Sequence, residues 1–121
     1  MFDKDYLLLD ETTLTANKNG DAFDVHWSTE VPQVFGLAVT GTISGTSPTL
    51  SVKIQGTNDG GSNWTDIVTF AQVTTVAKKL YVRALTPFKQ IRAVATKGGT
   101  NPSYGKVQCG IVPAGEYNLP K

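Results

Sequence analysis

The residues best suited to chemistry in this 121-residue chain begin with a histidine and a nearby aspartate. His26 is the only histidine, and Asp24 shares its strand face because one residue separates the two. Such a pair suits acid–base catalysis or metal binding, but a metal site needs at least three ligands and the sequence places none beside it. We therefore expect a polar strand face here, with no catalytic residue, no metal and no cofactor.

A second candidate is the segment from Asn58 to Asn63, which has the composition of a calcium-binding loop and is followed by Asp66. An EF-hand needs a bidentate Glu at its twelfth position, and that position counted from Asp59 is Phe70. The chemistry of a hairpin turn explains the same residues with fewer assumptions. A calcium site of another type remains a minor alternative.

Trp64 and Cys109 complete the set of candidates. Trp64 stands at the mouth of the same turn and is a possible ligand contact, for instance on a sugar, although a single tryptophan makes a weak sugar platform. Cys109 is the only cysteine, which excludes an intramolecular disulfide and a Cys-based zinc site.

Neither a phosphate-binding loop nor a nucleophile elbow occurs, so we expect a protein that is not an enzyme.

The element that positions most of these residues is a predicted β-hairpin over residues 51–68. Leu50, Val52 and Ile54 alternate with polar residues, as in a strand with one buried face. The residues from Asp59 to Ser62 reach positive φ easily, and 64–70 forms the return strand.

Further short strands are expected on both sides of this hairpin. They cover 12–16, 22–28, 34–43, 80–85, 88–96 and 104–112, with 44–48 as a loop, 97–102 as a turn and 71–79 extended. About eight or nine such strands without an amphipathic helix indicate an all-β fold. We expect an antiparallel Greek-key β-sandwich of jelly-roll type over 12–112, with an immunoglobulin-like sandwich as the alternative. An N-terminal arm (1–11) and an extended tail (113–121) flank it.

The charge is low but unevenly distributed. Charged residues make up 17% of the chain and the net charge is +1, which gives no footprint for nucleic acid or an anionic membrane. Residues 1–30 hold seven acidic and two basic residues, whereas 71–121 hold eight basic and one acidic. This asymmetry indicates either terminal strands that lie side by side or head-to-tail attraction between copies. The N-terminus resembles neither a signal peptide nor a membrane span, so we expect synthesis in a cytoplasm.

The two ends carry apolar residues that the strand pattern does not explain. They are Phe2, Tyr6 and Leu8 in the arm and Tyr117 and Leu119 in the tail. Ordering such segments costs about 1–2 kcal/mol of backbone entropy per residue. The ends therefore either pack on their own sandwich or bind neighbouring subunits.

The opening MFDKDYLLLD, the Thr- and Gly-rich body, the hairpin VKIQGTNDGGSNWTDI and the Pro-containing tail resemble structural proteins of tailed bacteriophage virions. The likeness is greatest to the jelly-roll capsid cement, or decoration, proteins. This resemblance covers most of the chain. Sequences similar to that of the hairpin also occur in phage tail and fibre modules.

The resemblance implies a homo-oligomer, dimer or trimer, which binds the outer surface of the capsid and clamps neighbouring major capsid proteins. The partner is then the major capsid protein, and the terminal apolar residues are the expected anchors, with no role for nucleic acid or membrane. The alternative is a receptor- or carbohydrate-binding module of a tail or fibre, in which Trp64 would contact the ligand.

Overall fold

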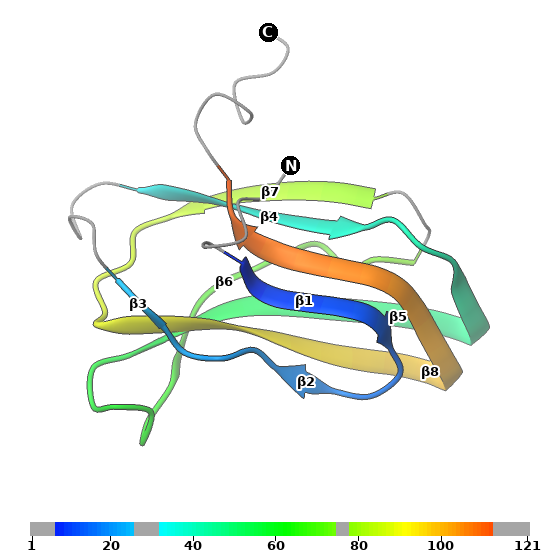
Figure 1. Cartoon of the computed structure of the whole chain (residues 1–121), viewed down its shortest axis with the longest axis horizontal. Helices are drawn as coiled ribbons and strands as arrows, with labels where there is room; N and C mark the ends of the chain where they lie inside the picture. Colours follow the sequence, from blue (N-terminus) through cyan, green and yellow to red (C-terminus); the bar gives the residue numbers. More distant parts are fainter. Residues whose placement is uncertain (1–6, 26–31, 75–77, 113–121) are drawn as a thin grey trace, which may run out of the picture.

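The computed structural model describes residues 7–25, 32–74 and 78–112, and these residues form eight β-strands and no helix (Figure 1). The all-β prediction is confirmed, and the architecture is consistent with a β-sandwich. The strands are β1 Leu7–Leu14, β2 Lys18–Asn19, β3 Phe23–Asp24, β4 Gln33–Val39, β5 Ile43–Thr57, β6 Thr65–Thr69, β7 Lys78–Ala84 and β8 Gln90–Ile111.

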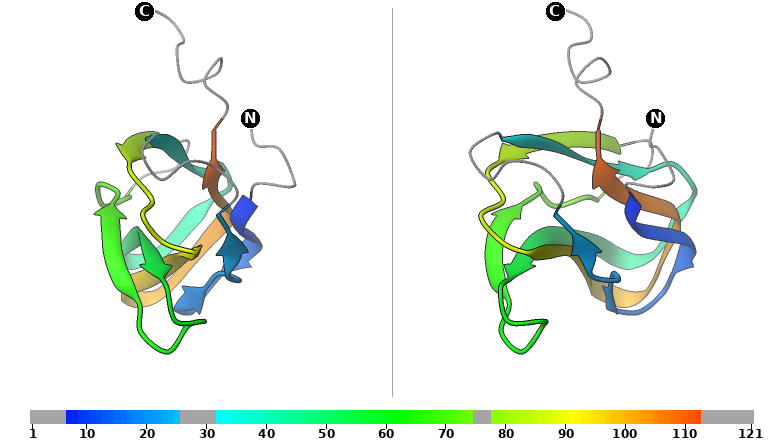
Figure 2. Two further views of the ribbon diagram at one scale, coloured as in Figure 1. Left: turned by 90° about the vertical axis from the view of Figure 1, so that its left-hand side faces the viewer. Right: turned by 60° about the vertical axis from the view of Figure 1, so that its left-hand side comes forward.

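The long strand β8 organises the sheet. One of its edges pairs with β4 and then β5, and the other pairs with β1, β2 and β3, always antiparallel. Outside these, β7 pairs with β4 and β6 pairs with β5, which gives the order β6-β5-β8-β4-β7. Because β5 and β8 both bend, this one sheet folds over itself into two layers and comes close to a closed barrel (Figure 2).

The bend lies where the sequence predicts chain breaks, and here that prediction is wrong. Residues 44–48 belong to β5 and 97–102 belong to β8, and the two stretches pair with each other through shifts in register. The residues of positive φ occur on both strands at this point: Gly45 and Ser47 on β5, and Gly99 and Asn101 on β8. These turn-forming residues bend two paired strands together instead of reversing the chain.

Tyr104 fixes this bend from the inside. Its ring is fully buried in the core. Its hydroxyl donates a hydrogen bond to the carbonyl oxygen of Thr49 on β5, and the carbonyl oxygen of Gly98 on β8 lies 3.2 Å away. Burial raises the pKa of the Tyr104 hydroxyl. One side chain thus connects both bent strands.

The core sits between the two layers and follows the alternation read from the sequence. The inward faces predicted for β4, β5 and the end of β8 are confirmed, and Cys109 is buried among them, with its pKa raised by that burial. The fully buried apolar side chains are Phe35, Leu37, Val39, Leu50, Val52, Ile54, Val73, Ile91, Ala93, Ala95, Tyr104, Val107 and Cys109.

Several strand boundaries differ from those expected. The first strand begins at Leu7 and not at Thr12, because Leu8 and Leu9 are long apolar residues that fill the core. The strand expected over 34–43 is interrupted after Val39 by a short bend, and the chain continues along β8 into β5, with the amide of Gly41 donating to the carbonyl of Gly105 at 2.8 Å. Of the strand expected over 22–28, the structure describes β3, and residues 26–28 lie outside the described residues.

Candidate functional site

The structure does not support a site formed by Asp24 and His26. Asp24 lies on β3 and accepts a hydrogen bond from the side-chain amide of Gln90 at 2.9 Å. His26 lies outside the described residues. Within the described ranges, no three His, Cys, Asp or Glu side chains are grouped so as to hold a metal ion.

The loop with calcium-binding composition is a hairpin turn whose acidic residue is fully engaged by its neighbours. The hydroxyl of Thr57 donates to Oδ1 of Asp59 at 2.7 Å. The backbone and side-chain amides of Asn63 donate to the same carboxylate at 3.0 and 2.9 Å. These hydrogen bonds, led by that from Thr57, hold the pKa of Asp59 well below its usual range. The carboxylate therefore stabilises the turn that joins β5 to β6.

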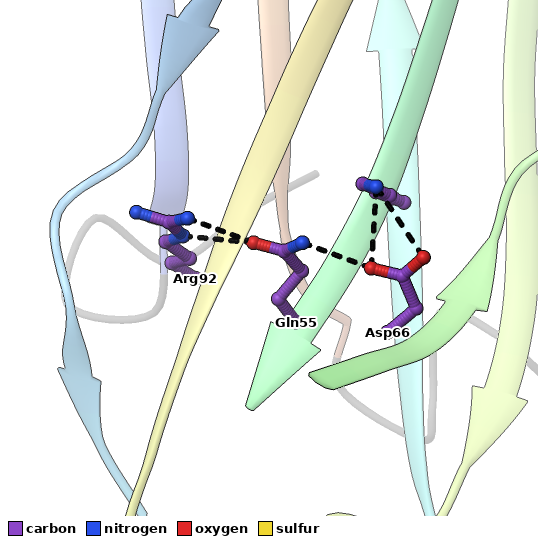
Figure 3. A network of polar contacts seen from close by, with 4 residues as sticks. Gln55, Asp66 and Arg92 are labelled. Atoms are coloured by element: carbon purple, nitrogen blue, oxygen red, sulfur yellow. Dashed lines mark hydrogen bonds and ion pairs between the residues drawn. The ribbon is translucent and has the colours of Figure 1, made fainter. Parts of the chain in front are cut away.

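Beside this turn, Trp64 stacks against an arginine from the middle of the sheet. The guanidinium carbon of Arg92 on β8 lies 4.1 Å from the centroid of the tryptophan ring, in cation–π geometry. The same guanidinium donates through Nε and Nη2 to Oε1 of Gln55 on β5, at 3.0 and 2.9 Å (Figure 3). Trp64 is thus part of a polar cluster on the outer face of the sheet.

The cluster continues across to β6. Nε2 of Gln55 donates to Oδ1 of Asp66 at 2.8 Å, and the ammonium group of Lys53 lies 3.2 Å from that oxygen (Figure 3). These contacts, with the Gln55 hydrogen bond as the largest contribution, lower the pKa of Asp66. Arg92, Gln55, Asp66 and Lys53 therefore form a row of groups that satisfy one another, called the outer-face row below.

Sequence reasoning placed Lys53 and Gln55 on the outward face of their strand but missed the outer-face row. The row depends on the register that sets Gln55 opposite Arg92 on one side and Asp66 on the other. Alternation within one strand does not specify that register. Chemically, the row offers planar polar groups and one ammonium group, and the ring of Trp64 lies against its Arg92 end.

The predicted anchor residues divide into two groups. Leu8 is 4% exposed and packs in the core of its own chain, so its side chain has a structural role in the sandwich. Phe2, Tyr6, Tyr117 and Leu119 lie outside the described residues, and their role stays a prediction.

The structure does place the attachment points of both terminal segments side by side. Leu7, where β1 begins, pairs with Gly110 near the end of β8. Two residues later the amide of Val112 donates to the carbonyl of Val34 at 2.8 Å, which holds the end of β8 against β4. Residues 1–6 and 113–121 are therefore joined to neighbouring points of the body (Figure 1).

A shallow cavity of about 230 Å³ lies along β1. It is bounded by residues 7–11 on one side and by Lys18, Gly20 and Asp21 on the other. Its polar groups are two surface carboxylates of β1, one lysine and Asp21, and they form no arrangement that suits catalysis.

Comparisons of the chain with protein-family models, curated proteins and solved structures find no match. Across the described ranges, no helix has the length and apolar character needed to span a membrane.

Proposed function

We propose that this chain is a non-enzymatic cement, or decoration, protein of a tailed bacteriophage. It binds the outer surface of the assembled head and clamps neighbouring major capsid proteins, and its sandwich has the jelly-roll type of Greek-key topology. The proposal starts from the resemblance of the hairpin, body and termini to such proteins. The all-β architecture is consistent with it.

The observation that carries the proposal is the position of the two attachment points. Leu7 pairs with Gly110, so the two terminal segments are attached to the body at neighbouring points. Two segments that are attached at neighbouring points and that carry apolar residues can bind the same partner together, and each then raises the effective concentration of the other. Repetition of such contacts by capsid symmetry multiplies weak individual affinities.

The body suits the same role because it joins its two layers covalently and by hydrogen bonds. The strands β5 and β8 run through both layers, and Tyr104 holds their bends together. A clamp has to transmit force between the molecules it binds, and a body whose layers share strands resists shear between them.

Removal of residues 1–6 tests the role of the arm. The deletion must stop before Leu7, because Leu8 and Leu9 belong to the core. We expect the truncated chain to keep the thermal stability of the full chain and to lose co-sedimentation with capsids that lack the endogenous protein. A control chain with Ser or Gly at positions 1–6 should behave like the deletion, and retained capsid binding by both would contradict the proposal.

A carbohydrate-binding module of a tail or fibre is the second candidate, and the half-buried Trp64 with its planar polar neighbours favours it. However, Arg92 stacks on the tryptophan ring, and the outer-face row already uses its own hydrogen-bonding groups. A glycan array with the full chain and with Trp64→Ala separates the two functions. Binding that is lost on the substitution supports the module, whereas the cement protein binds no glycan.

A further inference from the structure

Two dipeptides in the chain are prone to spontaneous covalent change, and the structure distinguishes between them. Asn19 is the only asparagine that precedes a glycine, and Asp59 is the only aspartate that does so. Because a glycine has no side chain, its backbone nitrogen is unshielded and can attack the side-chain carbonyl carbon, Cγ, of the residue before it. The sequence alone therefore marks both sites as reactive.

At Asp59 the hairpin turn opposes this attack. The hydroxyl of Thr57 and the two amide groups of Asn63 hold both oxygens of the carboxylate, at 2.7, 3.0 and 2.9 Å. These hydrogen bonds lower the pKa of Asp59, so the group stays ionised, and an ionised carboxylate is a poor electrophile. Rotation of the side chain towards the nitrogen of Gly60 would break them. Asp59 is therefore protected while the turn is formed.

Asn19 is protected only by a short piece of sheet. It is exposed on β2, a strand of two residues, and lies opposite Val94 of β8 (Figure 1). The amide of Gly20 donates to the carbonyl oxygen of Ala93 at 2.7 Å. This hydrogen bond and the extended backbone direct the nitrogen of Gly20 towards β8 and away from Cγ of Asn19. Attack therefore requires that β2 separate from β8, and such short exposed segments open at low cost.

The fold requires glycine at position 20, so the reactive dipeptide is part of the architecture. A Cβ added there would overlap the carbonyl oxygen of Leu8 on β1 and lie 3.1 Å from that of Ala93 on β8. Both are backbone atoms of paired strands, and they cannot move aside as the end of a flexible side chain would. The close approach of β1 and β8 thus places an unshielded nitrogen directly after Asn19.

We propose that Asn19 is the site of spontaneous deamidation in this chain and that the opening of β2 from β8 sets its rate. The nitrogen of Gly20 loses its proton and bonds to Cγ of Asn19, and the bond from Cγ to Nδ2 breaks as ammonia leaves. Water then opens the resulting succinimide ring at either carbonyl, which gives aspartate or isoaspartate. The net reaction consumes water and releases ammonia, with no oxidant or reductant. The inference does not depend on the proposed cement role.

The two products have different consequences for the fold. Aspartate at position 19 adds a negative charge at an exposed position. Isoaspartate directs the main chain through Cβ and Cγ, which lengthens it by one carbon atom before Gly20. Because Gly20 fits closely against Leu8 and is bonded to Ala93, the longer backbone cannot keep both contacts. We therefore expect isoaspartate to detach β2 from β8, whereas aspartate leaves the pairing in place.

Incubation of the purified full-length chain in mildly alkaline buffer, followed by peptide mapping with mass spectrometry, tests the proposal. We expect the mass increase of an amide-to-acid conversion at Asn19 before any other asparagine is converted, and no isoaspartate at Asp59. In urea the same chain should be deamidated at Asn19 at least about tenfold faster, because β2 is then always open. Asp59 should form isoaspartate only in urea.

Two matched substitutions test whether opening sets the rate. Oδ1 of Asn17 accepts a hydrogen bond from the amide of Lys97 at 2.9 Å and holds the beginning of β2 against β8. Asn17→Ala should speed deamidation of the folded chain about fivefold, as expected for one lost hydrogen bond, and leave the rate in urea unchanged. Asn58 accepts the equivalent bond from Lys89 at 3.0 Å in the hairpin turn, so Asn58→Ala should not change the rate at Asn19.

Two variants at the site itself serve as controls. Asn19→Gln keeps the amide but would need a larger ring, so it should abolish the modification. Asn19→Asp reproduces the charge of the product with a normal backbone, and it should melt at a higher temperature than the purified isoaspartate form.

Earlier modification of the folded chain at Asp59 or at another asparagine would overturn the proposal. Equal rates at Asn19 in the folded and the urea-unfolded chain would also overturn it, as would equal effects of Asn17→Ala and Asn58→Ala. No capsid takes part in these measurements, so their outcome leaves the proposed function to its own test.

Discussion

Two regions with the same turn-forming residue types behave in opposite ways. The segment from Asn58 to Asn63 reverses the chain between β5 and β6 at an exposed site. The segments 44–48 and 97–102 have similar composition, yet they pair with each other and let β5 and β8 continue through the bend. Turn composition marks where regular backbone geometry stops, and the pairing partners determine whether the chain reverses or bends.

The difference also separates a local feature from one on which the whole body depends. The hairpin turn is held by its own side chains, mainly through Asp59. The bend carries both layers of the sandwich and contains a fully buried tyrosine. Substitutions in the bend should therefore lower the free energy of unfolding more than comparable substitutions in the turn.

The largest effect is expected for Gly99→Ala. Gly99 has a φ of 96°, and an added Cβ would lie 2.5 Å from the carbonyl oxygen of Ser47 in the paired strand. Strained backbone and contact with a fixed backbone atom together should lower the free energy of unfolding by about 3 kcal/mol. Urea denaturation measures this loss, and a change below that of a turn glycine would contradict the role assigned to the bend.

Tyr104→Phe should have the next largest effect. The substitution keeps the buried ring but removes the hydroxyl that donates to Thr49 and lies against Gly98. Leaving buried carbonyl groups without their donor costs about 1–2 kcal/mol. Thermal and urea unfolding should both show the loss, and a variant as stable as the wild type would show that the hydroxyl does not hold the bend.

Gly60→Ala provides the matched change in the hairpin turn. Gly60 also has positive φ, at 75°, but nothing lies within 4 Å of the position of its added Cβ. The backbone strain alone should lower the free energy of unfolding by about 1 kcal/mol. A loss equal to that of Gly99→Ala would remove the distinction between turn and bend.

The smallest effect is expected from the charge of Asp59, and it depends on pH. Its pKa is lower in the folded chain than in the unfolded one, so its contribution is present above the unfolded value of about 3.9 and lost as pH falls towards the folded value. Asp59→Asn should therefore lower the melting temperature near neutral pH, and the difference from the wild type should shrink on acidification. A difference that stays constant down to pH 2 would contradict this assignment.

The sequence predicts the parts of this fold that depend on local alternation. The inward faces of Leu50, Val52 and Ile54, the hairpin and the buried Cys109 all follow from the spacing of apolar residues. The bend and the outer-face row depend on contacts between distant strands, such as Gln55 with Arg92, and local patterns do not encode that register.

The start of the first strand at Leu7 also could not be predicted from the local sequence pattern. The run of leucines at 7–9 contains no alternation, because a register irregularity between Leu7 and Leu9 lets both Leu8 and Leu9 enter the core. The sequence therefore reads as an apolar arm, and only the pairing with β8 identifies it as strand. For Phe2, Tyr6, Tyr117 and Leu119, which lie outside the described residues, binding remains a prediction.

The most direct test of the central claim is the copy number of the chain in purified virions, measured by quantitative mass spectrometry against the major capsid protein. A cement protein repeated by capsid symmetry should be present on the order of hundreds of copies per particle, and labelled antibodies should locate it on the head. A few copies to some dozens, located on the tail, would contradict the account and favour the binding module.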